Sequence, residues 1–317
     1  MPIDPQVIAH YEAKRAATST SQAFSTVEEA VAALRANADE LYNDKRQFPP
    51  VFSVTDASVP CFWGDMPIRI YSPGDKGPYP ILIYYHGGGF MIHNIASHDG
   101  ICRKLCLEAE ATVVSVGYRL TPEVKVSDCL VDSYMALDWV YDNAHTFGGD
   151  KTRIAVAGDS AGSMISASVA LLARDRKGPK IGLQILIYGT GCGLSEEESE
   201  SFRTLIDHNY VLNRGFMAVT EQAGRGGDAG VSEIYMNPGR CKDLSGMPKT
   251  FSLNAEYDPL RDDGEEYARR LKEAGNEVIS WRVPGMMHGF LLLWEKFDTS
   301  AFAMQEIARV FKETFAK

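Results

Sequence analysis

Short apolar runs and longer mixed segments alternate along most of this chain. The apolar runs have the length of buried strands, and a continuous run such as 181–188 is typical of a strand that is covered on both faces. The pattern predicts strands at about 51–55, 67–72, 80–85, 112–117, 150–157, 181–188, 250–255 and 277–283.

The segments between these strands carry helical patterns. Apolar residues recur on one stripe from Leu130 to Val140, and a run of small residues continues from the strand at 150–157 through Leu172. We therefore predict helices at 96–110, 127–144 and 262–274, and another after the strand at 150–157. Strands that alternate with helices predict an α/β fold, here a mostly parallel eight-stranded sheet flanked by helices.

Two segments depart from this alternation. Residues 1–48 precede the sheet and contain predicted helices at 9–17 and 26–42, the second with a Thr26/Glu29 capping box. Residues 189–237 are too long for a simple connection. The chain therefore divides into 1–48, a first core part at 49–188, an insertion at 189–237 and a second core part at 238–317.

The first candidate for chemistry is the sequence Gly158-Asp159-Ser160-Ala161-Gly162. It follows a predicted strand and precedes a predicted helix, so the serine lies at a sharp turn. The flanking glycines allow strand and helix to pass close to that turn. This context predicts that Ser160 is a nucleophile with its hydroxyl exposed.

A second candidate follows the strand at 80–85, which leads into His86-Gly87-Gly88-Gly89-Phe90. Three glycines leave backbone N–H groups open to a substrate, and acyl transfer needs such donors for the oxygen that becomes negative. A phosphate-binding loop would need a following Lys-Ser/Thr pair or a G-x-G-x-x-G spacing, and neither is present. We expect His86 to order this loop by hydrogen bonding.

The third candidate is a pair of residues near the C-terminus. Asp258 and His288 each follow a predicted strand, and the order Ser160, Asp258, His288 is that of the α/β-hydrolases. Asp262 or Asp263 could replace Asp258 as the acid, although both have the position of carboxylates that stabilise a helix start.

Together these motifs resemble the hormone-sensitive-lipase-like esterases, the bacterial type IV carboxylesterases. Tyr118-Arg119-Leu120-Thr121-Pro122-Glu123 adds to the resemblance, with Thr121 in place of the usual alanine. Ser163 stands where the family usually has glycine. The resemblance covers about 68–290 and implies an α/β-hydrolase fold, in which 1–48 and 189–237 form a helical cap over the active site.

The resemblance also implies roles for single residues. Ser160 would attack the ester, His288 would act as base, and Asp258 would orient His288. The backbone N–H groups of Gly87, Gly88 and Ala161 would form the oxyanion hole. Candidate walls of the substrate pocket are Phe90, Tyr188, Phe202 and Leu205. We therefore expect a serine carboxylesterase that hydrolyses short-chain acyl esters through an acyl-enzyme on Ser160.

Two other function classes use the same scaffold. An arylformamidase or amidase could use the same triad, so ester and amide hydrolysis stay open at this point. Non-catalytic receptors of small ligands, such as the plant hormone receptors of this fold, lose the histidine that this chain keeps as His288.

Composition narrows the expected partners. The net charge is −10, and no basic cluster is present, so neither nucleic acid nor an anionic membrane surface is an expected partner. We see no signal peptide and no apolar run of bilayer length. We expect a cytoplasmic protein with reduced cysteines, a small ester as substrate, no metal and no cofactor. A homodimer is a candidate assembly.

Overall fold

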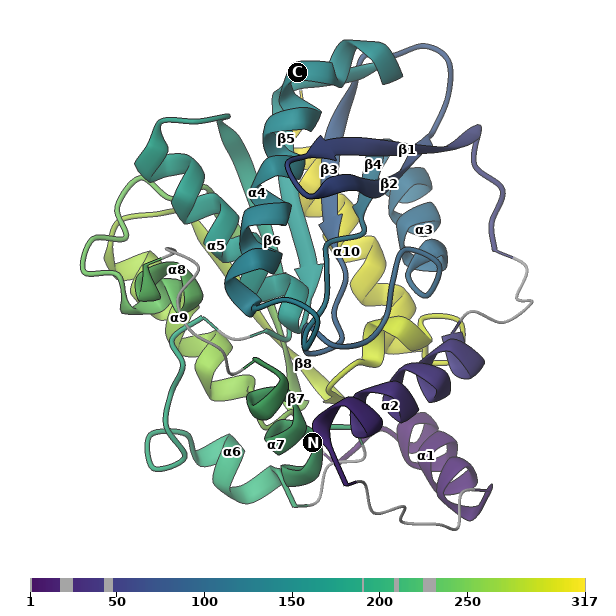
Figure 1. Ribbon diagram of the computed structural model, residues 1–317, viewed down its shortest axis with the longest axis vertical. Coiled ribbons are helices and arrows are strands. Elements are labelled where there is room, and N and C mark those ends of the chain that lie inside the picture. The colour runs from purple at the N-terminus through teal and green to yellow at the C-terminus, as the bar shows by residue number, and fades with distance from the viewer. Residues whose placement is uncertain are drawn as a thin grey trace.

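A computed structural model of the protein describes residues 2–17, 25–42, 48–189, 191–207, 211–224 and 232–316. Its centre is an eight-stranded sheet with the strand order β1-β2-β4-β3-β5-β6-β7-β8 (Figure 1). The strands are β1 (Ser53–Cys61), β2 (Gly64–Ser72), β3 (Tyr79–Tyr85), β4 (Thr112–Val116), β5 (Gly149–Asp159), β6 (Ile181–Ile187), β7 (Lys249–Tyr257) and β8 (Val278–Met287). Each of the predicted strands is present.

The sheet is antiparallel only at its β1 end. β2 pairs antiparallel with both β1 and β4, and all other neighbours are parallel. Parallel strands need long crossover connections, and these are made by the helices. The carboxyl ends of β3, β5, β6, β7 and β8 therefore meet at one edge of the sheet, where sites of open α/β sheets lie.

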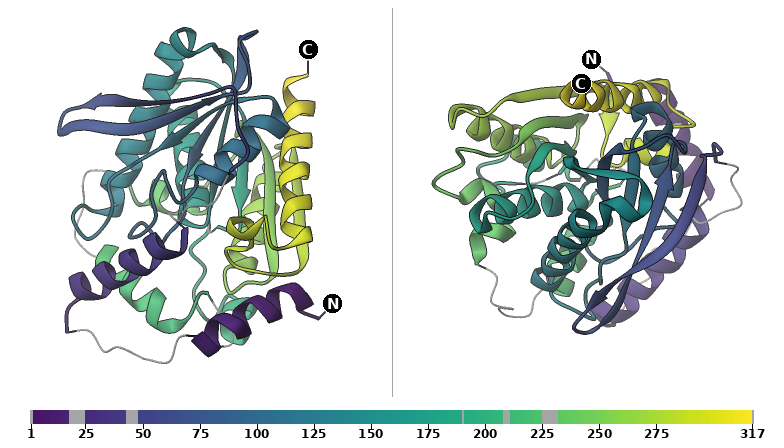
Figure 2. Two further views of the ribbon diagram at one scale, coloured as in Figure 1. Left: turned by 90° about the vertical axis from the view of Figure 1, so that its right-hand side faces the viewer. Right: turned by 90° about the horizontal axis from the view of Figure 1, so that it is seen from above.

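The helices cover both faces of the sheet (Figures 1 and 2). Side chains of β3 alternate between two apolar cores, with Ile81 and Ile83 on one face and Leu82 and Tyr84 on the other. The first core includes residues of α4 (Val126–Asn143), α5 (Ala161–Arg176) and α9 (Arg261–Glu273). The second includes residues of α1 (Pro5–Ala17), α3 (Asp99–Ala109) and α10 (Asp298–Phe315).

Two elements extend beyond the sequence pattern. The helix α10 was not predicted, yet it packs against α3 and fills the second core with Met304, Ile307 and Phe311. Strand β8 was expected to end at Val283, but it continues to Met287 through Pro284. Pro284 lies in an irregular stretch of this edge strand, between the pairs Ala255–Val283 and Tyr257–Met287, and such positions tolerate a residue without an N–H.

The two segments predicted to form a cap lie mostly at the carboxyl ends of the strands, except the short helix that ends the insertion, which packs on α5. The N-terminal segment contributes α1 and α2 (Val27–Tyr42), and the insertion contributes α6 (Glu200–Leu205), α7 (Arg214–Gly224) and α8 (Glu233–Met236). Helix α2 packs on α7 below the sheet in Figure 1, and both contact the loop after β3 through Met91 and Ile92. The remaining short helices are η1 (Ala144–Phe147), η2 (Pro238–Arg240) and η3 (Phe290–Leu293).

Hydrogen bonds also tie α2 to the core. Arg35 donates to the carbonyl oxygens of Met91 (2.8 Å) and Thr121 (2.9 Å), and it pairs with Glu123. At the start of this helix, Thr26 Oγ1 accepts the N–H of Glu29, while the Glu29 carboxylate accepts the N–H of Ser25 instead of closing the predicted box on Thr26. Within the described ranges, no helix is both long and apolar enough to cross a membrane.

Candidate active site

Ser160 lies at the turn between β5 and α5, with φ 54° and ψ −119°. Residues other than glycine rarely adopt this backbone conformation. The turn is held by a hydrogen bond from Ser160 N–H to Ile187 O (2.8 Å). A Cβ at Gly158 or Gly162 would clash with backbone atoms of the turn or of Tyr85. The predicted reason for both glycines, the close passage of strand and helix, is therefore confirmed.

The structure brings Ser160, His288 and Asp258 into one hydrogen-bonded chain. Ser160 Oγ lies 2.9 Å from His288 Nε2, and His288 Nδ1 lies 2.7 Å from Asp258 Oδ2. Asp258 is fully buried and His288 is 3% exposed, whereas Ser160 is partly exposed. A carboxylate on Nδ1 selects the imidazole form whose Nε2 accepts a proton, so this chain can activate the serine hydroxyl.

Asp258, and not its neighbours in sequence, contacts the histidine. Its second oxygen accepts the N–H of Leu260 at 2.9 Å, which fixes the carboxylate. Asp262 accepts from Ser201 N–H and pairs with Arg261. Asp263 accepts three backbone N–H groups, from Gly191, Cys192 and Leu194. Asp263 thus binds the segment before α6, and Asp262 binds the first turn of α6, which the start-of-helix interpretation did not anticipate.

Tyr188 packs behind the histidine. Its ring meets the ring of His288 edge to face at 5.0 Å and that of Phe290 at 5.2 Å. The residue is 1% exposed, so it supports His288 from the core side. Tyr188 was predicted to line the substrate pocket. The structure shows its ring in contact with His288, and its role in a pocket stays a prediction.

The glycines of the loop after β3 have different surroundings. Gly87 is buried and donates its N–H to Asp159 Oδ1 at 3.0 Å, so the prediction that it serves the oxyanion hole is wrong. Gly88 and Gly89 are partly exposed, with φ 111° and 60°. Among the described residues, no protein group accepts their N–H groups. Ala161 begins α5, so its N–H has no partner within the helix.

His86 orders the loop, as predicted. Its Nδ1 lies 2.7 Å from Gly87 O, and its ring stacks on Tyr118 at 4.3 Å. The Tyr118 hydroxyl in turn donates to His86 O at 2.6 Å. Burial lowers the pKa of His86 to about 3, so this ring is neutral at physiological pH and donates to the carbonyl.

The insertion contributes two residues beside this loop that the sequence did not single out. A Cβ built on Gly89 would lie 3.2 Å from Phe216 Cζ and from Thr220 Oγ1, so these α7 side chains lie directly beside the glycine. The predicted walls Phe202 and Leu205 lie half-buried on α6, and Phe90 is buried in the first core. Their roles in a pocket stay predictions.

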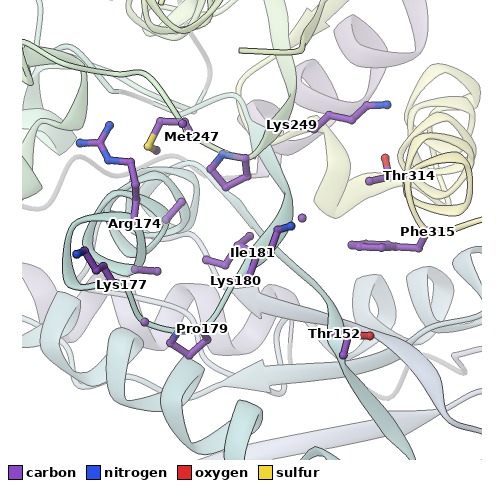
Figure 3. Close-up of a pocket in the computed structure, with 16 residues that line it drawn as sticks. Thr152, Arg174, Lys177, Pro179, Lys180, Ile181, Met247, Lys249, Thr314 and Phe315 are labelled. Carbon is purple, nitrogen blue, oxygen red and sulfur yellow. The ribbon is translucent and has the colours of Figure 1, made fainter. Parts of the chain in front are cut away.

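A cavity of about 740 Å³ lies elsewhere, at the amino ends of β5, β6 and β7 (Figure 3). Its lining includes Arg174, Lys177, Lys180 and Lys249, and none of the predicted site residues. Because Ser160 follows the carboxyl end of β5, this cavity lies at the opposite edge of the sheet from the triad and takes no part in its geometry.

Comparisons with known proteins agree with this geometry. The family model described as "alpha/beta hydrolase fold" matches residues 82–292. The chain is 41% identical over 232 residues to carboxylesterase NlhH of Mycobacterium tuberculosis, which covers 72% of each chain. It is 33% identical to an arylesterase of Saccharolobus solfataricus, over 92% of this chain and 93% of that one.

Solved structures give the same result over the whole chain. A hyperthermophilic esterase of the archaeon Pyrobaculum calidifontis superposes with a TM-score of 0.88 at 32% identity and covers 99% of each chain. The chain therefore belongs to the α/β-hydrolase fold family, within its hormone-sensitive-lipase-like, bacterial type IV group, and it is a serine carboxylesterase.

Proposed function

We propose that this carboxylesterase hydrolyses short-chain acyl esters through an acyl-enzyme on Ser160. The observation that carries the proposal is the hydrogen-bonded chain from Ser160 Oγ through His288 to the buried Asp258. A serine hydroxyl is a poor nucleophile at neutral pH, and this chain supplies the base that it needs.

The reaction would proceed in two matched halves. Ser160 Oγ bonds to the carbonyl carbon while its proton moves to His288 Nε2, and the carbonyl electrons move onto the oxygen. When the carbonyl re-forms, the bond to the alcohol oxygen breaks and His288 gives the proton to the alcohol. Water then repeats these steps on the acyl-enzyme, releasing the carboxylic acid and restoring Ser160.

The oxyanion hole of this proposal consists of the N–H groups of Gly88, Gly89 and Ala161. Gly88 and Gly89 are partly exposed, and their N–H groups have no protein acceptor within the described ranges. Removing one such donor typically lowers kcat by about 10²- to 10³-fold. Gly89 replaces Gly87 because the Gly87 N–H is already bound to Asp159.

The preference for short acyl chains rests on the segments 1–48 and 189–237, which we propose as the cap. Phe216 and Thr220 lie beside Gly89, and Val211 lies beside Gly289, where a Cβ would be 3.8 Å from Val211 Cγ1. Side chains of the insertion therefore approach both the oxyanion loop and the histidine loop. Such a cap limits the length of the acyl group.

We also propose that the protein acts in the cytoplasm. All six cysteines are free thiols, the state that a reducing compartment maintains. Cell fractionation with an antibody to the chain tests this location, and recovery from the periplasm or medium would contradict it.

The decisive experiment compares p-nitrophenyl esters from acetate to laurate with matched anilides, using the wild type and Ser160→Ala. Esters of butyrate length or shorter should be cleaved fastest, with a steep fall beyond about eight carbons. Ser160→Ala should lower kcat/KM by about 10⁴-fold or more, and a phosphonate should label only Ser160. Activity retained in Ser160→Ala would refute the mechanism, and faster anilide hydrolysis would make the enzyme an amidase.

A further inference from the structure

We propose that Asp159 is the residue that positions the oxyanion loop, by binding its first glycine and leaving the next two for the substrate. The inference rests on the proposed function, since it concerns how the oxyanion hole is held. Asp159 is the last residue of β5 and is 2% exposed. It neighbours Ser160 in sequence, but it takes no part in the triad.

The carboxylate of Asp159 joins three separate elements. Its Oδ1 accepts the Tyr84 hydroxyl of β3 at 2.9 Å and the Gly87 N–H of the loop at 3.0 Å. His98, which precedes α3, places its Nε2 at 3.1 Å from the same oxygen. Tyr84 and His98 are both fully buried. One side chain on the nucleophile strand therefore fixes the start of the loop that follows β3.

Gly87 fits this contact and no larger residue would. A Cβ at Gly87 would clash with the Asp159 carboxylate and with the Asp159 backbone carbonyl. The first glycine of the motif is therefore explained by the approach of Asp159, while Gly88 and Gly89 remain for the substrate. The sequence His86-Gly87-Gly88-Gly89 thus contains glycines that serve two different purposes.

The far end of the loop is also anchored. The N–H groups of Met91 and Ile92 both donate to Gly88 O at 3.0 Å, and Thr121 N–H donates to Phe90 O at 2.8 Å. Gly88 and Gly89 are thus held between an anchor at Gly87 and an anchor at Phe90 to Ile92. Release of the first anchor would let the two donors drift from the position of the oxyanion.

The charge of Asp159 suits this role. Burial by itself would raise the pKa of Asp159, but the neighbouring His98 ring and the Tyr84 hydroxyl lower the pKa to about 2. The group is therefore an acceptor-only carboxylate throughout the working range of the enzyme, and it accepts from Gly87 without a competing O–H. Other titratable rings packed nearby are His86 and His93, both within 6 Å of the His98 ring.

The test separates transition-state binding from folding and from substrate binding. The variants are Asp159→Ala, Asp159→Asn and Gly87→Ala, and the control is Asp263→Ala, which removes another buried carboxylate that accepts backbone N–H groups. For each, kcat and KM are measured with p-nitrophenyl butyrate, and the affinity is measured for a short-chain trifluoromethyl ketone, whose hemiketal oxygen mimics the oxyanion. Substrate affinity is measured separately in a Ser160→Ala background.

Asp159→Ala should lower kcat and ketone affinity together by about 10²-fold, the effect of about one oxyanion donor. KM and substrate affinity should change less than about threefold. Asp159→Asn should recover most of the loss, because the amide oxygen can still accept from Gly87. Gly87→Ala, which removes no polar group, should behave like Asp159→Ala, and Asp263→Ala should lower stability without lowering ketone affinity.

The inference is overturned if Asp159→Ala and Gly87→Ala bind the ketone as tightly as the wild type, or if Asp263→Ala loses the same affinity. If Asp159→Ala does not fold, Gly87→Ala decides alone: wild-type ketone affinity refutes the inference and a loss of about 10²-fold supports it. Failure of the ketone to bind the wild type, or activity in Ser160→Ala, would instead refute the proposed function.

Discussion

Two buried aspartate–histidine pairs lie at the same edge of the sheet, one on each side of the nucleophile turn. Asp258 and His288 come from the ends of β7 and β8, and His288 Nε2 reaches Ser160 Oγ on a different element. Asp159 and His98 come from β5 and the start of α3. His98 directs its other nitrogen to Ser97 Oγ, its own neighbour in sequence, at 2.9 Å.

The difference between the pairs lies in what the histidine can reach. Ser160 is partly exposed at a strained turn, whereas Ser97 is 5% exposed and its Oγ also bonds Asn94. The same pair of residue types thus serves chemistry where its histidine faces an accessible hydroxyl, and serves structure where it faces a buried one. Access of the third residue, and not the presence of an Asp–His contact, assigns the role.

The largest expected effect sets the two histidines apart. His288→Ala should lower kcat/KM by about 10⁴-fold or more, because triad members act as a unit. His98→Ala should lower it by less than about 10²-fold, since it only weakens the hold on the loop. Hydrolysis of p-nitrophenyl butyrate measures both, with circular dichroism as the folding control. Equal losses of kcat/KM in the two variants would contradict the assignment of one pair to chemistry and the other to structure.

The acid of the reactive pair should show the next largest effect. Asp258→Asn keeps the shape but no longer selects the imidazole form that accepts the serine proton, so kcat should fall by about 10³- to 10⁴-fold. Asp262→Asn is the matched control, because Asp262 is a neighbouring carboxylate that contacts Ser201 and Arg261 instead of His288. Its kcat should stay within about threefold of the wild type, and a larger loss would reopen the identity of the acid.

Low pH should destabilise the fold through the buried histidines near the oxyanion loop. Burial lowers the pKa values of His86 and His93 to about 3, from an ordinary value of 6.5. The unfolded chain therefore binds more protons between about pH 6.5 and 3, and the free energy of unfolding falls as pH falls through that window. Urea denaturation at pH 7.5, 6, 5 and 4 measures the slope. His86→Asn should flatten it, and an unchanged slope would contradict the neutral buried ring.

The smallest effect should come from the insertion. Phe216→Ala removes a side chain beside Gly89, and Val211→Ala trims one beside Gly289. If the acyl group lies along the oxyanion loop, Phe216→Ala should raise the relative rate on octanoate over butyrate by a few-fold, and Val211→Ala should not. The opposite result would place the acyl group on the histidine side.

The sequence by itself determined most of the sheet and the reactive residues. Apolar runs mark strands because a buried parallel strand has no polar face. The glycines around Ser160 and after His86 mark the turn and the loop because neighbouring atoms approach them too closely for a side chain. Ser160, Asp258 and His288 could therefore be named from motif, order and strand ends. Helix α10 was not predicted; its apolar side chains are buried by packing on α3, a contact with a distant segment.

Only the tertiary structure decided which glycine N–H groups bind a protein acceptor and which remain for the substrate. Gly87 and Gly88 are adjacent in sequence and equal in chemistry, and only the position of Asp159, more than seventy residues away, assigns the N–H of Gly87 to a protein acceptor. Likewise, Phe216 lies beside Gly89 on helix α7, which packs on α2 of the N-terminal segment. Contacts between distant segments depend on the packed geometry of the whole sheet, and no local pattern of residues encodes them.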